Sequence, residues 1–424
     1  MSTPEPPPPP QIEAPSALAL LRVFRHRNYR LFFSGQLVSL MGTWMQSIAQ
    51  GWLVYALTHS PFLLGVTSFA GQVPVFFVAA FGGMIADRVD RRSMLIVTQS
   101  LAMTQAAILA TLTLTGIVKV EEVILLAFCI GLVNAFDIPT RQAFTVDMVG
   151  RDDLRNAISL NSMMFNLARI IGPTAAGLLV AVAGEGVCFA INAFSYGAVL
   201  TSLFLIRVPP KPERAAGHPL RELRAGAHYA WTTPQIRNAL LLVAVCASFG
   251  ASYLALMPAV ARDVLHQGSE GLGYLMGSVG VGALFGAYAL ARVHDRHLTL
   301  TPILAAAGFG ASLVLFAHSR WLPLSMALLL PTSFCLMLLG GSTNTIIQTV
   351  AKDHFRGRVV SFYTMSFMGM MPWGALMLGS IASHAGVGEA VTIGGSIVIA
   401  AALAAFFARG DRTDLVRPGP APGE

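Results

Sequence analysis

Residues 31–86 contain no Asp, Glu, Lys or Arg, and this absence constrains the fold more than any other feature of the chain. An α-helix rises 1.5 Å per residue, so about 20 apolar residues cross a bilayer. The stretch is therefore too long for a single span. Thr58, His59, Ser60 and Pro61 supply a turn near its middle. We expect two membrane-spanning helices joined by this turn.

The same bias extends over the whole chain. Of its 424 residues, 54% are hydrophobic and 12% are charged, whereas soluble domains carry about twice that charge. Splitting the apolar runs at charged or Pro/Gly-rich breaks predicts twelve spans, at residues 31–57, 62–86, 94–116, 122–143, 157–183, 187–206, 237–260, 271–292, 299–317, 322–348, 359–384 and 389–408. We therefore expect an all-α polytopic membrane protein, since β-barrel strands would instead alternate over about ten residues.

The basic residues predict how these spans are oriented. If the N-terminus lies inside, 24 of the 28 Lys and Arg fall in inner segments. Outer loops hold Lys119, Arg262 and Arg320, and Arg169 lies inside a span. Because basic loops stay on the cytoplasmic side, we expect both termini in the cytoplasm and the protein in the cytoplasmic (inner) membrane. Anionic lipid then accounts for the net charge of +7 without a nucleic-acid partner.

Weak internal similarity predicts two repeated halves. Asp87-Arg88 corresponds to Asp295-Arg296, and Pro173 corresponds to Pro372 at a similar offset. Two parallel six-span halves are a transporter architecture. The expected organisation is a disordered Pro-rich tail (1–17), an N-terminal half (18–206), a cytoplasmic central loop (207–236), a C-terminal half (237–408) and a disordered C-terminal tail (409–424).

A charged knot follows the second span, with the sequence GMIADRVDRRS at residues 83–93. It resembles the major facilitator signature G-x-x-x-D-R-x-G-R-R, matched by Gly83, Asp87, Arg88, Arg91 and Arg92, with Asp90 in place of the second glycine. Other stretches resemble macrolide-efflux proteins and the enterobactin exporter, among them NAFDIPTRQAF at 134–144 and RGRVVSFYTM at 356–365. The resemblance covers about 20–410 and implies the major facilitator fold.

The resemblance also implies a role for the knot. In that family the loop forms a charge relay that locks the cytoplasmic gate, so Asp87 would lie near the start of span 11 and pair with Arg91. Arg91 would in turn meet Asp147 at the end of span 4. A helix N-terminus favours a carboxylate, which is consistent with this role for Asp87. The alternative is a solvated loop that only sets the topology.

Charges inside spans are costly and mark functional sites. Asp137 lies in span 4, where it either forms an interfacial ion pair with Arg141 at i+4 or acts as the acid that couples transport to protons. Arg169 lies about 18 Å into span 5 by the helical rise, near the midplane. Arg169 is either a functional residue that couples with Asp137 in at least one state, or a structural residue that bonds to backbone carbonyls.

Polar side chains within spans predict a substrate cavity. A polar stripe in lipid must face protein or water, and the alternative to a cavity is interhelical hydrogen bonding. The candidates are Gln36, Trp44, Gln46, Gln50, Asn161, Asn166, Asn344 and Gln348. Gly172 and Pro173, with Gly177, resemble a reduced form of the family's span-5 antiporter motif, and we expect helix packing there.

These patterns together predict a secondary active transporter working by alternating access. The resemblance implies export of a bulky amphipathic molecule such as a drug, siderophore or lipophilic metabolite, with a proton as the expected counter-ion. The alternatives are an uptake permease, a non-transporting receptor and a membrane-embedded enzyme. The chain has no HExxH, GxSxG or Walker motif, so we expect no enzyme, cofactor or metal. The oligomeric state is open, with a monomer favoured.

Overall fold

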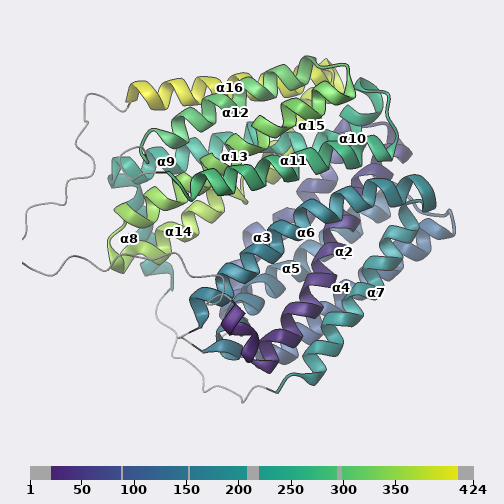
Figure 1. Cartoon of the computed structure of the whole chain (residues 1–424), viewed down its shortest axis with the longest axis vertical. Coiled ribbons are helices and arrows are strands. Elements are labelled where there is room, and N and C mark those ends of the chain that lie inside the picture. The colour runs from purple at the N-terminus through teal and green to yellow at the C-terminus, as the bar shows by residue number, and fades with distance from the viewer. Residues whose placement is uncertain (1–20, 87–88, 151–152, 208–218, 294–297, 409–424) are drawn as a thin grey trace, which may run out of the picture.

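The computed structural model describes residues 21–86, 89–150, 153–207, 219–293 and 298–408. Every regular element in these ranges is helical. The predicted tails and the pairs Asp87-Arg88 and Asp295-Arg296 lie outside the described residues, as does most of residues 207–218. Figure 1 shows two helical bundles packed against each other, one purple to teal and one green to yellow.

The N-terminal half contains six long helices that correspond to the first six predicted spans. They are α2 (Arg27–Thr58), α3 (Pro61–Ala86), α4 (Arg91–Leu114), α5 (Val120–Val149), α6 (Leu154–Ala183) and α7 (Glu185–Leu205). Eleven helical stretches in the described residues are long and apolar enough to cross a membrane. α2 adds a twelfth with 32 residues, although polar side chains interrupt its apolar sequence.

The C-terminal half supplies the other six spans. The first is α9 (Pro234–Val245) with an irregular continuation to Val264, followed by α11 (Ser269–Leu290), α12 (Thr301–His318), α13 (Leu322–Val350), α14 (Asp353–Phe367) joined to α15 (Met371–Ala385), and α16 (Val387–Ala408). The prediction of twelve spans in two six-helix halves is thus confirmed, with ends shifted by a few residues.

The segment 207–236, which we predicted to be a cytoplasmic central loop, contains a helix in its described part. α8 (Pro219–Thr232) has one apolar side, which buries Ala230 against α14. The ring of Tyr229 stacks on that of Phe355, with centroids 4.6 Å apart. An amphipathic stretch outside the membrane forms a helix when a neighbouring surface covers its apolar face, and α14 provides that surface.

The first span of the C-terminal half departs from regular α-helix. After α9 come a π turn, η2 (Cys246–Gly250), a 3₁₀ segment, η3 (Ala251–Leu256), the short α10 (Met257–Ala259) and a second π turn, η4 (Val260–Val264). Pro258 contributes because it has no N–H to donate to the preceding turn. Such mid-helix irregularities often mark functional hinges.

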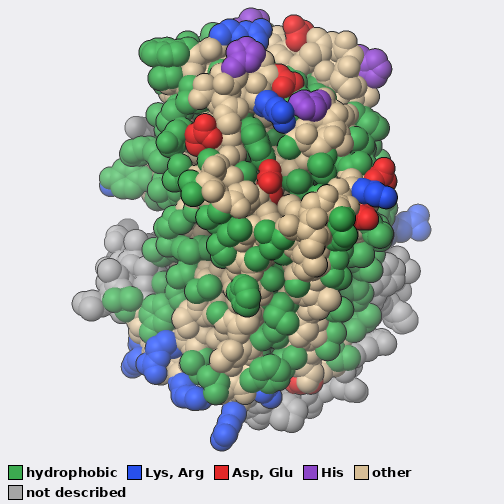
Figure 2. Space-filling view, turned by 90° about the vertical axis from the view of Figure 1, so that its right-hand side faces the viewer, with side chains coloured by type: hydrophobic (Ala, Val, Ile, Leu, Met, Phe, Trp, Pro, Cys, Tyr) green, Lys and Arg blue, Asp and Glu red, His purple; other side chains and the backbone are tan. Residues whose placement is uncertain are grey.

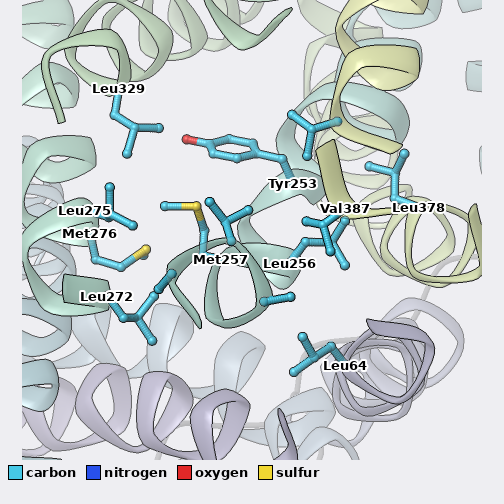
Figure 3. Packing of buried hydrophobic residues seen from close by; sticks show 14 of the residues in the cluster. Leu64, Tyr253, Leu256, Met257, Leu272, Leu275, Met276, Leu329, Leu378 and Val387 are labelled. Carbon is cyan, nitrogen blue, oxygen red and sulfur yellow. The ribbon is translucent and has the colours of Figure 1, made fainter. Parts of the chain in front are cut away.

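This irregular segment passes through the largest apolar core of the molecule. Tyr253 is fully buried there, and Figure 3 shows its ring beside Met257 and Leu256, with the hydroxyl pointing toward Leu329. Within the described residues this hydroxyl has no hydrogen-bond partner. The core therefore extends from the irregular span to α11 and α13.

The two halves meet at one end of the bundle, which we call the closed end. There α3 packs on α15, and α6 packs on α11. A Cβ added to Gly65 would collide with the backbone of Ala375, and one added to Gly177 would collide with Gly273. These glycines let the helix backbones touch. Hydrophobic side chains cover much of the molecular face seen in Figure 2.

Toward the other end, which we call the open end, the described helices pack mainly within their own half. Phe76 of α3 touches Gly369 between α14 and α15. Beyond that point α14 packs on α8, α9 and α13 of its own half, and α3 packs on α5. The open end carries the loops that we predicted to be cytoplasmic.

Candidate functional site

The turn after α3 is shaped by Asp90. It is the N-cap of α4, and its Oδ2 accepts hydrogen bonds from Ser93 N at 2.8 Å and from Ser93 Oγ at 2.6 Å. A glycine at this position would leave the first turn of α4 without a side-chain cap. Asp90, the departure from the family signature, therefore has a local structural role. Gly83 lies in α3, and Asp87 and Arg88 lie outside the described residues.

The two arginines that follow Asp90 contact other helices of the same half. Arg91 Nη1 lies 3.0 Å from Asp147 Oδ2 and also donates to the carbonyl of Ala143 on α5. Arg92 Nε donates to Leu203 O at 2.7 Å, and its Nη2 donates to Phe204 O at 3.1 Å, near the end of α7. The structure thus brings Arg91 and Asp147 together as the resemblance implied, and Arg92 satisfies carbonyls at a helix C-terminus.

Asp137 lies in a closed polar site inside the N-terminal half. Its side chain is buried, and Oδ1 accepts hydrogen bonds from Thr98 Oγ1 and Gln99 Nε2 on α4, each at 2.8 Å. Oδ2 pairs with Arg141 one turn further along α5. The structure shows the Asp137–Arg141 ion pair that the sequence offered as one interpretation, and the role of Asp137 as a coupling acid stays a prediction. A buried carboxylate held by a cation and two donors is electrostatically compensated.

Arg169 has a different environment. It is half-buried, and its Nη2 donates to Asn166 Oδ1 at 3.1 Å on the same helix. In the described part of the chain no carboxylate lies within ion-pair distance of it. The expected pairing of Arg169 with Asp137 is absent from this conformation, because Asp137 is taken by Arg141, Thr98 and Gln99.

Two of the predicted cavity residues, Gln46 and Asn161, form hydrogen bonds between helices of the N-terminal half. Gln46 donates to Gln105 on α4 at 3.1 Å and accepts from Asn192 on α7 at 2.7 Å. Asn161 accepts from the hydroxyl of Tyr29 at 3.0 Å. These contacts match the interhelical alternative that the sequence left open. Gln36 is also buried, Gln50 and Asn344 are half-buried, and Gln348 is exposed.

A second group lies on the face of α6 between the sides that pack on α2 and on α11. α6 presents Gly172 to α2 and Thr174 and Gly177 to α11. At helical spacing, Ser162, Phe165, Asn166 and Arg169 lie on this face, which continues along α6 to Gly172, and Ser162 and Phe165 are exposed. Trp44 of α2 borders this face, since its ring meets that of Phe165 edge-on at 5.5 Å. This face combines aromatic rings, an amide and a cation.

A cluster of residues on α6 lies where this helix meets α2 and α11, and it consists of Gly172, Pro173 and Gly177. A Cβ on Gly172 would stand 2.7 Å from Trp44 Cβ and 3.0 Å from Met41 O, and Gly177 abuts Gly273. Pro173 lies inside α6, which continues through it. The cluster therefore places α6 tightly against α2 on one side and α11 on another.

Sequence reasoning missed a contact between the halves at the closed end. The hydroxyl of Tyr55, in the last turn of α2, donates a hydrogen bond to Asp263 Oδ2 in η4. A cavity of about 380 Å³ adjoins them, and His59, Arg320 and Glu389 are among its lining residues. In the sequence, Asp263 simply follows Arg262, which we placed in an outer loop, and nothing there indicates a partner. Only the fold shows that α2 ends beside Asp263.

A second missed contact ties the chain before α2 to the start of α6. His26 Nε2 lies 2.8 Å from Asp153 Oδ2, and Arg22 Nε lies 3.9 Å from Asp153 Oδ1. The hydrogen bond from His26, aided by the charge of Arg22, holds the pKa of the Asp153 carboxyl below its usual value. This contact joins the chain before α2 to the start of α6 at the open end.

Curated relatives of the chain include transporters of siderophores. It is 27% identical over 390 residues to the staphyloferrin A transporter of Staphylococcus aureus, covering 89% of this chain and 95% of that protein. It is 24% identical over 378 residues to the enterobactin exporter EntS of Shigella boydii, covering 86% and 87%. Both alignments cover more than four fifths of this chain.

Solved transporter structures share the fold of this chain. A bacterial homologue of the human lysosomal transporter Spinster, solved in an inward-facing and unoccupied conformation, superposes with a TM-score of 0.74 at 12% identity, covering 96% of this chain and all of that one. This likeness shows the shared fold. The model of the transmembrane secretion effector family matches residues 17–416. The chain is therefore a multi-pass membrane transporter of the major facilitator superfamily and belongs to its transmembrane secretion effector family.

Proposed function

We propose that this protein is a secondary active exporter that moves a bulky amphipathic small molecule out of the cytoplasm by alternating access. The observation that carries this proposal is the arrangement of the halves, which meet at the closed end, whereas toward the end with the basic loops the described helices pack mainly within their own half. Basic loops face the cytoplasm, so this conformation opens inward, in a cytoplasmic (inner) membrane with both termini inside. The two six-helix halves are the bodies that rock.

The face of α6 that carries Phe165, Asn166 and Arg169 is the proposed wall of the substrate path. Trp44 and Phe165 offer aromatic surface, Asn166 offers an amide, and Arg169 offers a cation near the midplane. An aromatic surface beside a single cation suits an amphipathic molecule with an anionic group. The two relatives are named for transport of staphyloferrin A and enterobactin, so the proposed substrate class is the siderophores.

Asp137 is the proposed site of proton coupling. Its carboxylate is buried and paired with Arg141, so a proton taken up there would remove the charge that holds the arginine. Arg141 would then pair with another group when the halves move. Such a change in pairing can bias a two-state equilibrium, because it stabilises one state more than the other.

We propose that the Arg91–Asp147 pair supports the cytoplasmic gate structurally. It fixes the start of α4 against the end of α5, next to the turn that carries Asp87. In the outward-open state this turn would meet the start of α14, whose N-terminus favours a carboxylate. The relay would then exist only when the open end has closed.

Transport into everted membrane vesicles tests the proposal. Vesicles from a bacterial host lacking its major exporters should accumulate substrate when an imposed proton gradient is inside-acid. The compound panel should include iron-free siderophores, macrolides and lipophilic cations. Arg169→Gln should reduce uptake of anionic compounds most, while Gly197→Ala serves as the control, because nothing lies within 4 Å of a Cβ at Gly197. Gradient-driven loss from everted vesicles, with accumulation by intact cells, would overturn export in favour of uptake.

A further inference from the structure

The contact between Tyr55 and Asp263 joins equivalent places in the two halves. Tyr55 lies four residues before His59, where α2 ends, and Asp263 lies three residues before His266, near the end of the first C-terminal span. Both histidines have the same left-handed backbone angle, φ 51°. The first span of each half therefore ends in a similar turn, and the hydrogen bond links these two ends across the interface.

The π turn η4 helps to place the carboxylate. A π turn holds more residues than an α turn, so it changes the direction of the side chains that it carries. Asp263 lies within η4, which spans Val260–Val264, and its carboxylate reaches the hydroxyl of Tyr55. Such single π turns are found often at functional sites.

The surroundings of the pair suit a bond that forms and breaks. The side chain of Tyr55 is buried, whereas that of Asp263 is exposed beside the cavity of about 380 Å³. Arg320 before α13 and Glu389 of α16 also line this cavity, together with His59. Water can thus hydrate the carboxylate when the bond opens, so separation does not leave a buried charge unpaired.

The neighbouring closed-end contacts are of another kind. α6 meets α11 through Gly177 and Gly273, and α3 meets α15 through Gly65 and through the rings of Phe69 and Trp373, 4.9 Å apart. Such contacts depend on shape and have little directional preference. A charge-assisted hydrogen bond adds direction and breaks over a short separation.

We propose that Tyr55 and Asp263 form the latch of the outer gate and set the balance between the inward-open and outward-open states. The proposal rests on the proposed function, because it assumes that the closed end faces outward and opens during transport. The hydrogen bond exists only while the halves touch there. It therefore stabilises the inward-open state alone, and its removal shifts the population toward outward-open.

Distances between spin labels test the latch without any substrate. Ile117 and Trp321 are exposed in closed-end loops of the two halves, and Leu205 and Phe407 are exposed at the open end. Each pair would be changed to cysteine and labelled in a background without the native cysteines, which are Cys129, Cys188, Cys246 and Cys335. Pulsed electron paramagnetic resonance on the purified full-length protein then gives the fraction in each state.

Tyr55→Phe and Asp263→Ala should each raise the ratio of outward-open to inward-open protein about tenfold, the range of a partly exposed charged hydrogen bond. The closed-end distance should lengthen and the open-end distance should shorten together. The double variant should shift no further than the larger single shift. Tyr253→Phe is the matched control, because within the described residues the buried hydroxyl of Tyr253 has no hydrogen-bond partner.

Unchanged distances in Tyr55→Phe and Asp263→Ala would overturn the latch, as would an equal shift in Tyr253→Phe. Lengthening at the closed end without shortening at the open end would indicate local loosening and would also overturn it. These outcomes differ from those that would overturn the proposed function. If the distances shift as expected but vesicles carry none of the panel, the latch stands and the export proposal falls.

Discussion

Arg91 Nη1 lies 3.0 Å from Asp147 Oδ2, and both residues belong to the same half, on α4 and α5. The pair therefore moves as one body when the halves rock, unlike the latch, which spans the interface. This difference separates two kinds of gate residue. Those that support a gate from within one half should affect stability, whereas those that bridge the halves should affect the conformational balance.

Arg91→Gln and Asp147→Asn should both lower the stability of the purified protein. The side chain of Asp147 is 7% exposed, and loss of a partner for a largely buried polar group costs about 1–3 kcal/mol. Thermal unfolding in detergent should show a lower midpoint for each single variant and little further change in the double variant. Full additivity would mean that the two side chains act on stability through separate partners.

Asp137→Asn should abolish uphill export but permit downhill exchange. An amide cannot carry a proton, yet its oxygen still accepts the hydrogen bonds from Thr98 and Gln99. Fluorescence of a pH dye in everted vesicles should show no substrate-induced proton release, while exchange of labelled for unlabelled substrate continues. Retained uphill accumulation would exclude Asp137 as the proton carrier.

Double-variant cycles should separate Arg141 from Arg169. Asp137 contacts Arg141 directly, so Asp137→Asn and Arg141→Gln should combine far from additively in transport rate. Asp137→Asn combined with Arg169→Gln should be close to additive in transport rate. The reason is that Arg169 contacts Asn166 in this structure and not Asp137. Strong coupling of Arg169 with Asp137 would instead show that the two meet in another state, as the sequence first suggested.

The sequence predicted the spans well because each span must satisfy its own backbone in lipid. A long apolar run such as residues 31–86 has few structural options, and its two helices were found within a few residues of the expected ends. It was harder to predict which neighbouring helix each polar side chain faces. Gln46 and Trp44 are two positions apart on α2, yet one points to α4 and α7 and the other to α6.

Contacts across the interface were the least predictable. Tyr55 and Asp263 are 208 residues apart, and neither residue type at its position signals a partner. The contact needs the exact end of α2, the π turn at η4 and the relative position of the halves, and none of these follows from hydropathy. Asp90 could have been found, since an Asp directly before the first residue of a helix is a common N-cap.

The contact of Asp153 with His26 should give stability that depends on pH. Its folded pKa lies below the usual value of about 3.9, so the contribution is complete above that value and is lost as the pH falls through the folded pKa. The difference in unfolding midpoint between the native protein and Asp153→Asn should thus be largest above pH of about 5 and shrink below about 4. His26→Ala should show a similar trend, and a pH-independent difference would contradict it.

Gly177→Val should prevent the closed end from closing. A Cβ at Gly177 already collides with the backbone of Gly273, so a branched side chain must push α6 away from α11. Since this contact exists while the closed end is shut, the variant should favour the outward-open state and lengthen the distance between labels at positions 117 and 321. Gly197→Val adds the same side chain where nothing lies within 4 Å of the new Cβ and should leave that distance unchanged. If Gly177→Val folds with the native distance, the close packing of α6 on α11 does not hold the outer gate.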